Sequence, residues 1–229
     1  MKFRKNVTTN LKVIEMRTLV KTIILGFAFV VTPMLTGCQS TIPVKINMDD
    51  IQKPATSTDL KINILSQAKD TRSQSPDQVG RHTISLLMIP GGTVSTEDSL
   101  NKGVVDRLAE ALKSVGYKVN LVDDVTDAKE MGEPVLFVQI ETLKNYLFSW
   151  LYPLGLTFGS MDLSLHLISP KGTEIWKQEL AGHGGVMPSL LYMSGFETRV
   201  TSDLTANVNQ AIKAISSDEF RKAMKSAEY

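Results

Sequence analysis

The pattern of apolar and polar positions from residue 60 onward predicts one folded domain over 60–229. Apolar residues alternate with polar ones in six stretches that we expect to be strands: 60–65, 83–89, 117–122, 134–152, 161–167 and 173–180. They recur at every third or fourth position in two stretches that we expect to be helices: 97–115 and 200–215. Ser217 is expected to start a short last helix. Polar or glycine-rich loops are expected between these elements.

The order of these elements predicts an α+β fold with a mixed or mostly antiparallel sheet of about five to six strands. The two main helices are expected to pack on one face of that sheet. Leu100, Val104 and Leu108 lie at helical spacing in the first helix, so they form the stripe that should face the sheet.

The segment before the domain has the organisation of a secretory signal over residues 1–37. Basic residues precede an apolar run, 22–31, which is far shorter than the roughly 20 apolar residues that span a bilayer. Met16 starts a compact basic stretch, so the functional start of translation is expected there.

The signal segment ends in Leu35-Thr36-Gly37-Cys38, which resembles the lipobox of bacterial lipoproteins, where the cysteine is acylated before cleavage. Cys38 is the only cysteine, so no intramolecular disulfide can form. The sequence therefore predicts lipidation at Cys38 and attachment to a membrane through the acyl group. The alternative is a plain signal peptide with a chance cysteine.

Residues 38–59 contain prolines and a Thr/Ser-rich end, so they are expected to be a lipidated cysteine followed by a flexible tether. A random coil of about 20 residues has a typical reach of roughly 25 Å. By resemblance to enteric lipoproteins, Gln39 after the cysteine favours the outer membrane over the inner membrane. The domain would then face the periplasm.

The chain also resembles the YajG-like group of small bacterial envelope lipoproteins. The matching features are Lys69-Asp70-Thr71-Arg72, Val79-Gly80, Val115-Gly116-Tyr117-Lys118-Val119, the strand with Trp176 and the C-terminal helix. The resemblance implies an envelope lipoprotein without known catalysis, and it supplies no active-site residues. The sequence departs from the group over 146–158.

Candidate chemistry is sparse. The formal net charge of +1 gives no electrostatic reason to expect nucleic acid as a partner. His82, His166 and His183 lack the spacing of metal ligands or of a catalytic motif, so we expect no metal, no cofactor and no enzyme activity. Asp70 and Arg72 lie on one side of a strand end, where they either contact a polar ligand or pair with each other.

The aromatic segment 146–158 is the strongest candidate for a contact surface. In a strand, Tyr146, Phe148, Trp150 and Tyr152 share one face, and Leu143, Leu147 and Leu151 share the other. One face then meets a partner protein or a lipid surface, or it is covered within the chain. The leading hypothesis is a non-enzymatic accessory lipoprotein that docks on an envelope protein assembly. The alternatives are a small-molecule or glycan binder, with its cleft beside the Gly-rich loop 182–195, and an unrecognised hydrolase.

Overall fold

The computed structural model describes residues 40–54, 60–84, 89–151, 154–182, 185–189 and 192–227. The chain divides into two units, Met1–Cys38 and Gln39–Tyr229. The expected signal segment and Cys38 lie outside the described residues. Within these ranges, no helix is long and apolar enough to span a membrane.

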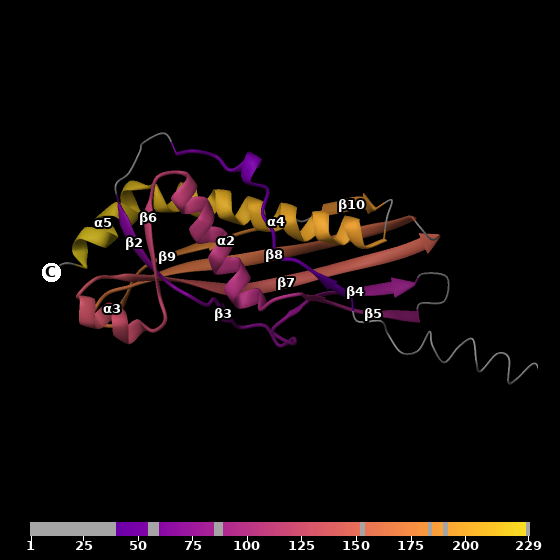
Figure 1. The fold of residues 1–229 in the computed structure, drawn as a ribbon, viewed down its shortest axis with the longest axis horizontal. Coiled ribbons are helices and arrows are strands. Elements are labelled where there is room, and N and C mark those ends of the chain that lie inside the picture. Colours follow the sequence, from indigo (N-terminus) through magenta and orange to yellow (C-terminus); the bar gives the residue numbers. More distant parts are fainter. Residues whose placement is uncertain are drawn as a thin grey trace, which may run out of the picture. The chain divides into compact units, whose positions relative to one another are not determined.

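The domain contains runs of consecutive strands separated by helices along the chain (Figure 1). The strands are β1 Ser40–Ile42, β2 Lys61–Leu65, β3 Lys69–Asp70, β4 Gln78–Ile84, β5 Ile89–Thr96, β6 Lys118–Val122, β7 Val135–Leu151, β8 Leu154–Ile168, β9 Glu174–Leu180 and β10 Gly185–Ser189. The helices are the single turn η1 Met48–Asp50, α2 Leu100–Ser114, α3 Val125–Met131, α4 Tyr192–Ile215 and α5 Asp218–Ser226.

One mixed sheet is built around the long antiparallel hairpin of β7 and β8. The free edge of β7 is long enough to pair in succession with β2, β3 and β4, all parallel to it. On the other side of the hairpin, β8 pairs antiparallel with β9 near one end and with β10 near the other. Beyond these strands, β4 pairs with β5, β5 with β1, and β2 with β6. The strand order along this path is therefore β1-β5-β4-β7-β2-β6.

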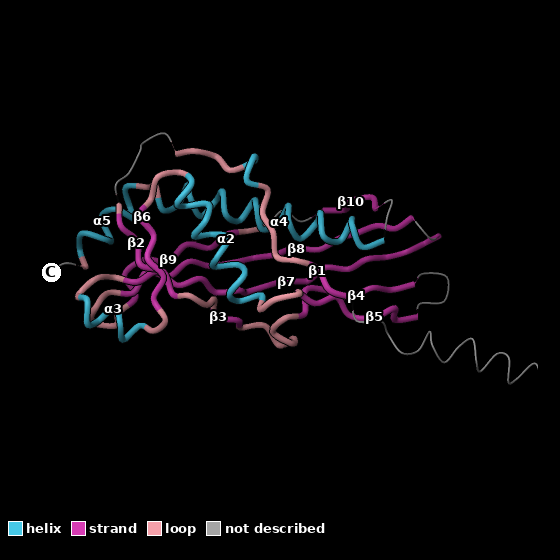
Figure 2. Tube along the Cα trace, in the orientation of Figure 1, coloured by secondary structure: helices cyan, strands magenta, loops and turns pink. Residues whose placement is uncertain are grey.

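Helices α2 and α4 pack on one face of this sheet and bury the main apolar core (Figure 2). Leu108 of α2 is only 3% exposed, and Leu136, Val138 and Ile140 of β7 are fully buried beneath the helices. The predicted α+β class, with two main helices on one face of a mixed sheet, is therefore confirmed. The sheet has more strands than the sequence predicts, because β1, β3 and β10 lie in segments expected to be a tether or loops and the one strand expected over 83–89 is divided between β4 and β5.

The N-terminal segment 40–54 differs from the expected tether because it packs against the domain. β1 extends the sheet in parallel with β5, and Ile42 and Val44 are 2% and 8% exposed. Arg107 of α2 donates to the Val44 carbonyl at 3.2 Å, and the Gln52 amide donates to Asn209 of α4 at 2.8 Å. These contacts leave Gln39 as the one residue between Cys38 and the first strand.

Candidate functional site

An exposed apolar patch lies on the sheet face opposite the helices, near the end of the β7–β8 hairpin. Tyr146 and Phe148 of β7 stand opposite Phe158 and Leu156 of β8 in the antiparallel register. Tyr146 and Phe158 are each 40% exposed, and their rings stack with centroids 5.4 Å apart. We call these four residues the aromatic face.

The alternation of side chains explains why this patch is left open. Leu143 and Leu147 point to the opposite side of β7, where they are fully buried with the helix-covered core. Tyr146 and Phe148 must then point away from the helices. The side chains of Trp150 and Tyr152, also expected on this face, lie outside the described residues.

Half of the large apolar side chains that are exposed in the described part of the domain belong to the aromatic face. Among the described residues, the large apolar side chains that remain exposed are Met48, Leu121, Met131, Tyr146, Leu156 and Phe158. The last three are neighbours on two paired strands. Single exposed apolar residues are ordinary, whereas a contiguous aromatic cluster is typical of an interaction surface.

Asp70 and Arg72 form an ion pair that closes the loop between β3 and β4. The Arg72 Nη2 atom lies 2.6 Å from the Asp70 carboxylate, and the two side chains are only 4% and 9% exposed. Arg72 also donates to the carbonyls of Gln78 and Pro76, both at 2.7 Å. Burial raises the pKa of Asp70, but the hydrogen bonds and charge of Arg72 outweigh it and lower the pKa overall.

We expect Arg72→Met to destabilise the domain by about 3 kcal/mol, because it leaves the Asp70 carboxylate buried without its partner. The lowered pKa of Asp70 means that the pair stabilises the native chain above the unfolded-state pKa, roughly 3.9. That stability is lost as the pH falls through the lower, folded-state pKa. Urea unfolding at pH 7 and under acid conditions measures both effects. A smaller loss for the double variant Asp70→Asn, Arg72→Met is the matched control, and an unchanged midpoint in Arg72→Met contradicts the assignment.

A hydrogen-bonded network links Ser164, His166 and Glu174 on the sheet face that also carries the aromatic face. Ser164 Oγ lies 2.9 Å from His166 Nε2, and His166 Nδ1 lies 2.5 Å from the Glu174 carboxylate. This connectivity is that of a serine hydrolase triad. The Ser164 side chain is fully buried, however, and its hydroxyl also bonds Glu141 at 2.7 Å. An attacking oxygen must reach a substrate carbonyl, so this geometry supports a structural network rather than a nucleophile.

The network could not be found from sequence spacing alone. The hairpin of β8 and β9 is expected from the tight turn at Pro170-Lys171-Gly172, but its register, with a shift between Leu167 and Ile168 that brings Glu174 to His166, is not. Hydrogen bonding from Ser164, together with smaller contributions from Gln139 and nearby charge, lowers the pKa of Glu141 against the effect of its burial. His82 lies buried in β4, and His183 lies outside the described residues. In the described part of the chain, no three His, Cys, Asp or Glu side chains group as metal ligands do.

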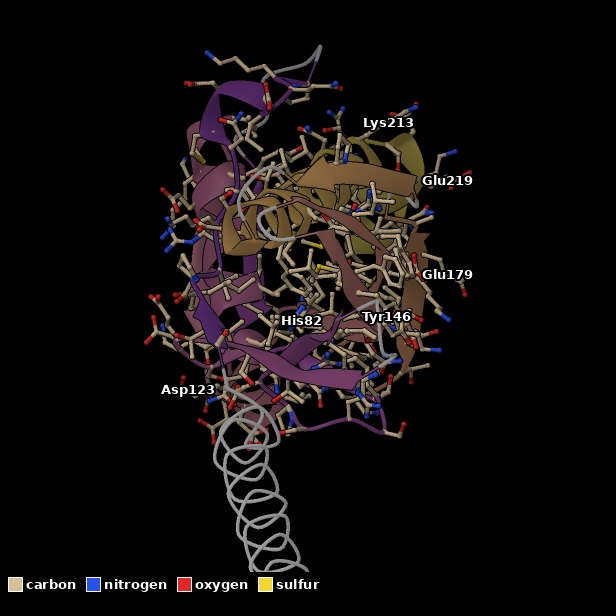
Figure 3. All side chains as sticks on the ribbon, turned by 90° about the vertical axis from the view of Figure 1, so that its right-hand side faces the viewer. His82, Asp123, Tyr146, Glu179, Lys213 and Glu219 are labelled. Carbon is tan, nitrogen blue, oxygen red and sulfur yellow. The ribbon has the colours of Figure 1, made fainter. Side chains whose placement is uncertain are left out.

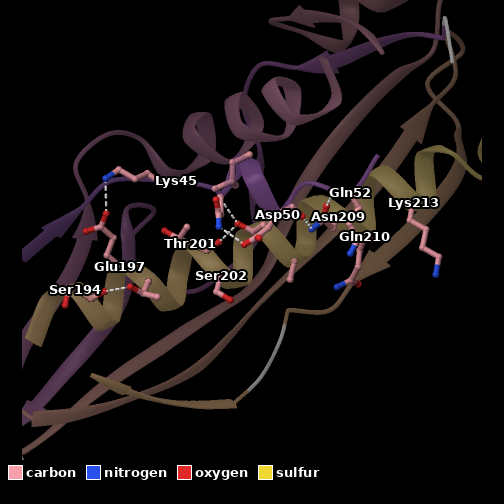
Figure 4. A pocket seen from close by; sticks show the side chains of 15 residues that line it. Lys45, Asp50, Gln52, Ser194, Glu197, Thr201, Ser202, Asn209, Gln210 and Lys213 are labelled. Atoms are coloured by element: carbon pink, nitrogen blue, oxygen red, sulfur yellow. Dashed lines mark hydrogen bonds and ion pairs between the residues drawn. The ribbon is translucent and has the colours of Figure 1, made fainter. Parts of the chain in front are cut away.

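A polar groove of about 900 Å³ runs between the segment 45–52 and helix α4 (Figure 4). Hydroxyl and amide side chains of α4 line it, among them Thr201, Ser202 and Gln210. The Lys45–Glu197 ion pair, at 2.9 Å, closes one part of the wall. Residues 185–189 of the expected Gly-rich loop form β10 and pair with β8, so this part of the loop extends the sheet.

Comparisons with known proteins give structural similarities only. No family model matches the chain, and no curated protein matches it either. A Xanthomonas campestris protein of the DUF330 family has a TM-score of 0.46 and 13% identity, covering 82% of this chain and 98% of its own. A Helicobacter pylori homologue of the neuraminyllactose-binding hemagglutinin has a TM-score of 0.49 and 12% identity, covering 80% and 98%.

A third similar structure is a dodecamer of PelC from Paraburkholderia phytofirmans, with a TM-score of 0.38 and 12% identity, covering 69% of this chain and 92% of its own. Similarities this low carry no conclusion about what the present chain binds or how it assembles. Its function is therefore argued from its own residues.

Proposed function

We propose that this chain is a lipoprotein of the cell envelope, acylated at Cys38, whose domain is a non-enzymatic module that docks on a partner protein. The signal organisation of 1–37 and the lone cysteine after Gly37 support the acylation. Gln39 supports an outer-membrane location with the domain on the periplasmic side. The buried Ser164 supports a role other than hydrolysis.

The aromatic face is the observation that carries the docking role. Tyr146, Leu156 and Phe158 expose apolar surface together although the sheet has an ample buried core on its other side. Aromatic residues dominate the energetics of protein interfaces, and tyrosine tolerates a half-wet setting. The proposed partner is an envelope protein that covers this patch.

The double variant Tyr146→Ser, Phe158→Ser tests the docking role. We expect its thermal midpoint to change little, because both side chains are 40% exposed, whereas crosslinking of the domain to its partner in intact envelopes should fall several-fold. Phe196→Ser is the matched control, since Phe196 of α4 is fully buried and its loss should lower the thermal midpoint strongly. Unchanged crosslinks in a folded double variant would exclude the aromatic face as the docking surface.

A second candidate function is the binding of a neutral polyhydroxylated ligand, which the groove along α4 favours. Its hydroxyl and amide side chains suit sugar hydroxyls, and Asn209 is held in place by bonds to Gln52 and Asp50. Titration with N-acetylglucosamine oligomers, followed by NMR, tests this candidate. Ser202→Arg should block the groove, and shifts that are identical in this variant would exclude the groove as the binding site.

A further inference from the structure

Two shallow hollows lie next to each other at the end of the sheet where β2 and β6 begin. One, of about 410 Å³, lies between the start of β2 and helix α5, and the other, of about 440 Å³, lies between β6 and the end of α2. Lys61 lines both of them. This end, with the labels of α5, β2 and β6, is on the left of Figure 1, and Figure 3 views the molecule from the opposite end, where Tyr146 of the aromatic face is labelled.

The side chains that line these two hollows are strongly basic. Five of them carry a positive charge: Lys61, Lys113, Lys118, Arg221 and Lys225. Glu133 is the one carboxylate among the described residues that line the hollows. The formal net charge of the whole chain is only +1, so positive charge is concentrated here. A local excess of this kind attracts anions to the surface. We call the two hollows together the basic end.

The pairing of Lys61 with Lys118 is the least expected feature of the basic end. Strands β2 and β6 are parallel, and Lys61 stands directly opposite Lys118 in their register. Like charges directly opposite each other on paired strands destabilise a sheet. Both side chains are exposed, so the packing of the core does not require a lysine at either position. Positions that break a local rule in this way are typical of functional sites.

Two further lysines have an ordinary structural explanation, which does not extend to this pair. Lys113 and Lys225 lie in the last turns of α2 and α5, where a positive charge interacts favourably with the helix dipole. Neither takes part in an ion pair within the described part of the chain, so both charges are also available to an anion. Lys61 and Lys118 are instead the first residues of strands, where no helix dipole favours them.

Glu133 and Asn63 hold Lys61 in place between the two hollows. Lys61 Nζ donates to both carboxylate oxygens of Glu133, at 3.0 and 2.8 Å, and Asn63 Nδ2 donates to the same carboxylate at 2.8 Å. These hydrogen bonds lower the pKa of Glu133, so it is ionised at neutral pH. Asn63 is 3% exposed and accepts a bond from Asn120 at 3.2 Å, which fixes its amide. Glu133 offsets one of the five positive charges in the hollows, and the other four remain in excess.

We propose that the basic end binds phosphate groups, one in each hollow on either side of Lys61. The lysines supply point charges, and the planar guanidinium of the half-buried Arg221 suits two phosphate oxygens at once. Adjacent basic hollows suit a ligand with two phosphates better than a ligand with one. The phosphate belongs either to a lipid headgroup or to a soluble phosphorylated compound. The basic end shares no residue with the aromatic face or with the groove along α4, so this inference goes beyond the proposed function.

Methionine methyl NMR tests the proposal, because Met224 lines the first hollow whereas Met161 is fully buried in the core. The full-length protein, in micelles of a neutral maltoside detergent, is titrated with fructose 6-phosphate and with fructose 1,6-bisphosphate. A third titration adds phosphatidylglycerol to the micelles. We expect the Met224 signal to shift in a saturable way while the Met161 signal stays in place. The bisphosphate should bind several-fold more tightly than the monophosphate.

The double variant Lys113→Gln, Lys118→Gln removes two charges of the second hollow and should weaken bisphosphate binding several-fold, toward that of the monophosphate. Lys102→Gln is the matched control, because it makes the same change at the other end of α2 and should bind as the wild type does. Thermal midpoints should change little, since these lysines are exposed. Lys225→Gln, in the first hollow, repeats the test if the double variant proves unstable.

The three titrations separate the two sources of phosphate. A Met224 shift with the bisphosphate alone assigns the basic end to a soluble phosphorylated compound, and a shift with phosphatidylglycerol assigns it to lipid headgroups. An unmoved Met224 signal in all three titrations would overturn the inference. Equal weakening by Lys102→Gln would show general charge attraction and would overturn it as well. None of these measurements depends on lipidation or on docking, so a negative result leaves the proposed function intact.

Discussion

A Leu108→Asp chain is expected to lose its cooperative fold. Leu108 is 3% exposed in α2, at the contact between this helix and the sheet. The substitution removes core packing worth roughly 2–5 kcal/mol and buries an unpaired charge at a cost of several more. A domain of this kind has a total stability of about 5–15 kcal/mol, so the combined cost is comparable with the whole.

Thermal unfolding followed by near-ultraviolet circular dichroism checks this result. Leu121→Asp is the matched control, since it makes the same chemical change at a position of β6 that is 39% exposed. The control should unfold cooperatively near the wild-type midpoint. A cooperative transition at the wild-type midpoint in Leu108→Asp would show that the α2 stripe is not part of the core.

The elements with strong periodicity could be predicted from the sequence. Helix α2 and the hairpin strand β7 lie within two or three residues of their expected ranges, because an apolar stripe or an alternation of many residues is difficult to satisfy in another conformation. The stretch 83–89 shows the limit of a short pattern. It predicts one strand, but it contains the end of β4 and the start of β5, since a short apolar run does not show where a chain reverses.

The remaining differences between the expected and the observed elements arise where contacts with distant parts of the chain determine the local structure. Helix α4 starts at Tyr192, not near residue 200, and its Phe196 is fully buried against β4. A Cβ atom at Gly80 would lie 2.3 Å from the Phe196 ring, so this close approach needs glycine. Likewise, β1 is ordered by β5 and α2, which are distant in the sequence. No local pattern in 40–54 indicates these partners.

The candidate site was predictable only where it follows alternation along one strand. Tyr146 and Phe148 are expected on one face from the sequence, and the structure places them there. Leu156 and Phe158 complete the aromatic face through the cross-strand register, which the sequence leaves open. The pairing of Asp70 with Arg72 was one of two alternatives, and the burial of both side chains favours it over a ligand contact.

Cys38→Ala is expected to abolish acylation and leave an uncleaved or mislocalised precursor. Cys38 is the only thiol of the chain, so no other residue can accept the thioether-linked lipid. The domain itself should keep its thermal midpoint, because in the described part of the chain the first buried core residue is Ile42, and β1 begins after Cys38. Intact mass of the protein and its distribution between membrane and soluble fractions check both expectations.

Gly37→Ala is the matched control for that variant, because it keeps a small residue at the cut site and should be processed and acylated normally. The physical reason for a large effect is that the domain has little else to hold it on a membrane. Contacts of a folded domain with the membrane surface are weak and reversible by themselves, and stable attachment needs acyl chains. Cys38→Ala should therefore shift the protein out of the membrane fraction even though the aromatic face is unchanged. A mature wild-type protein that begins after Cys38 and carries no acyl mass would show that the lipoprotein assignment is wrong.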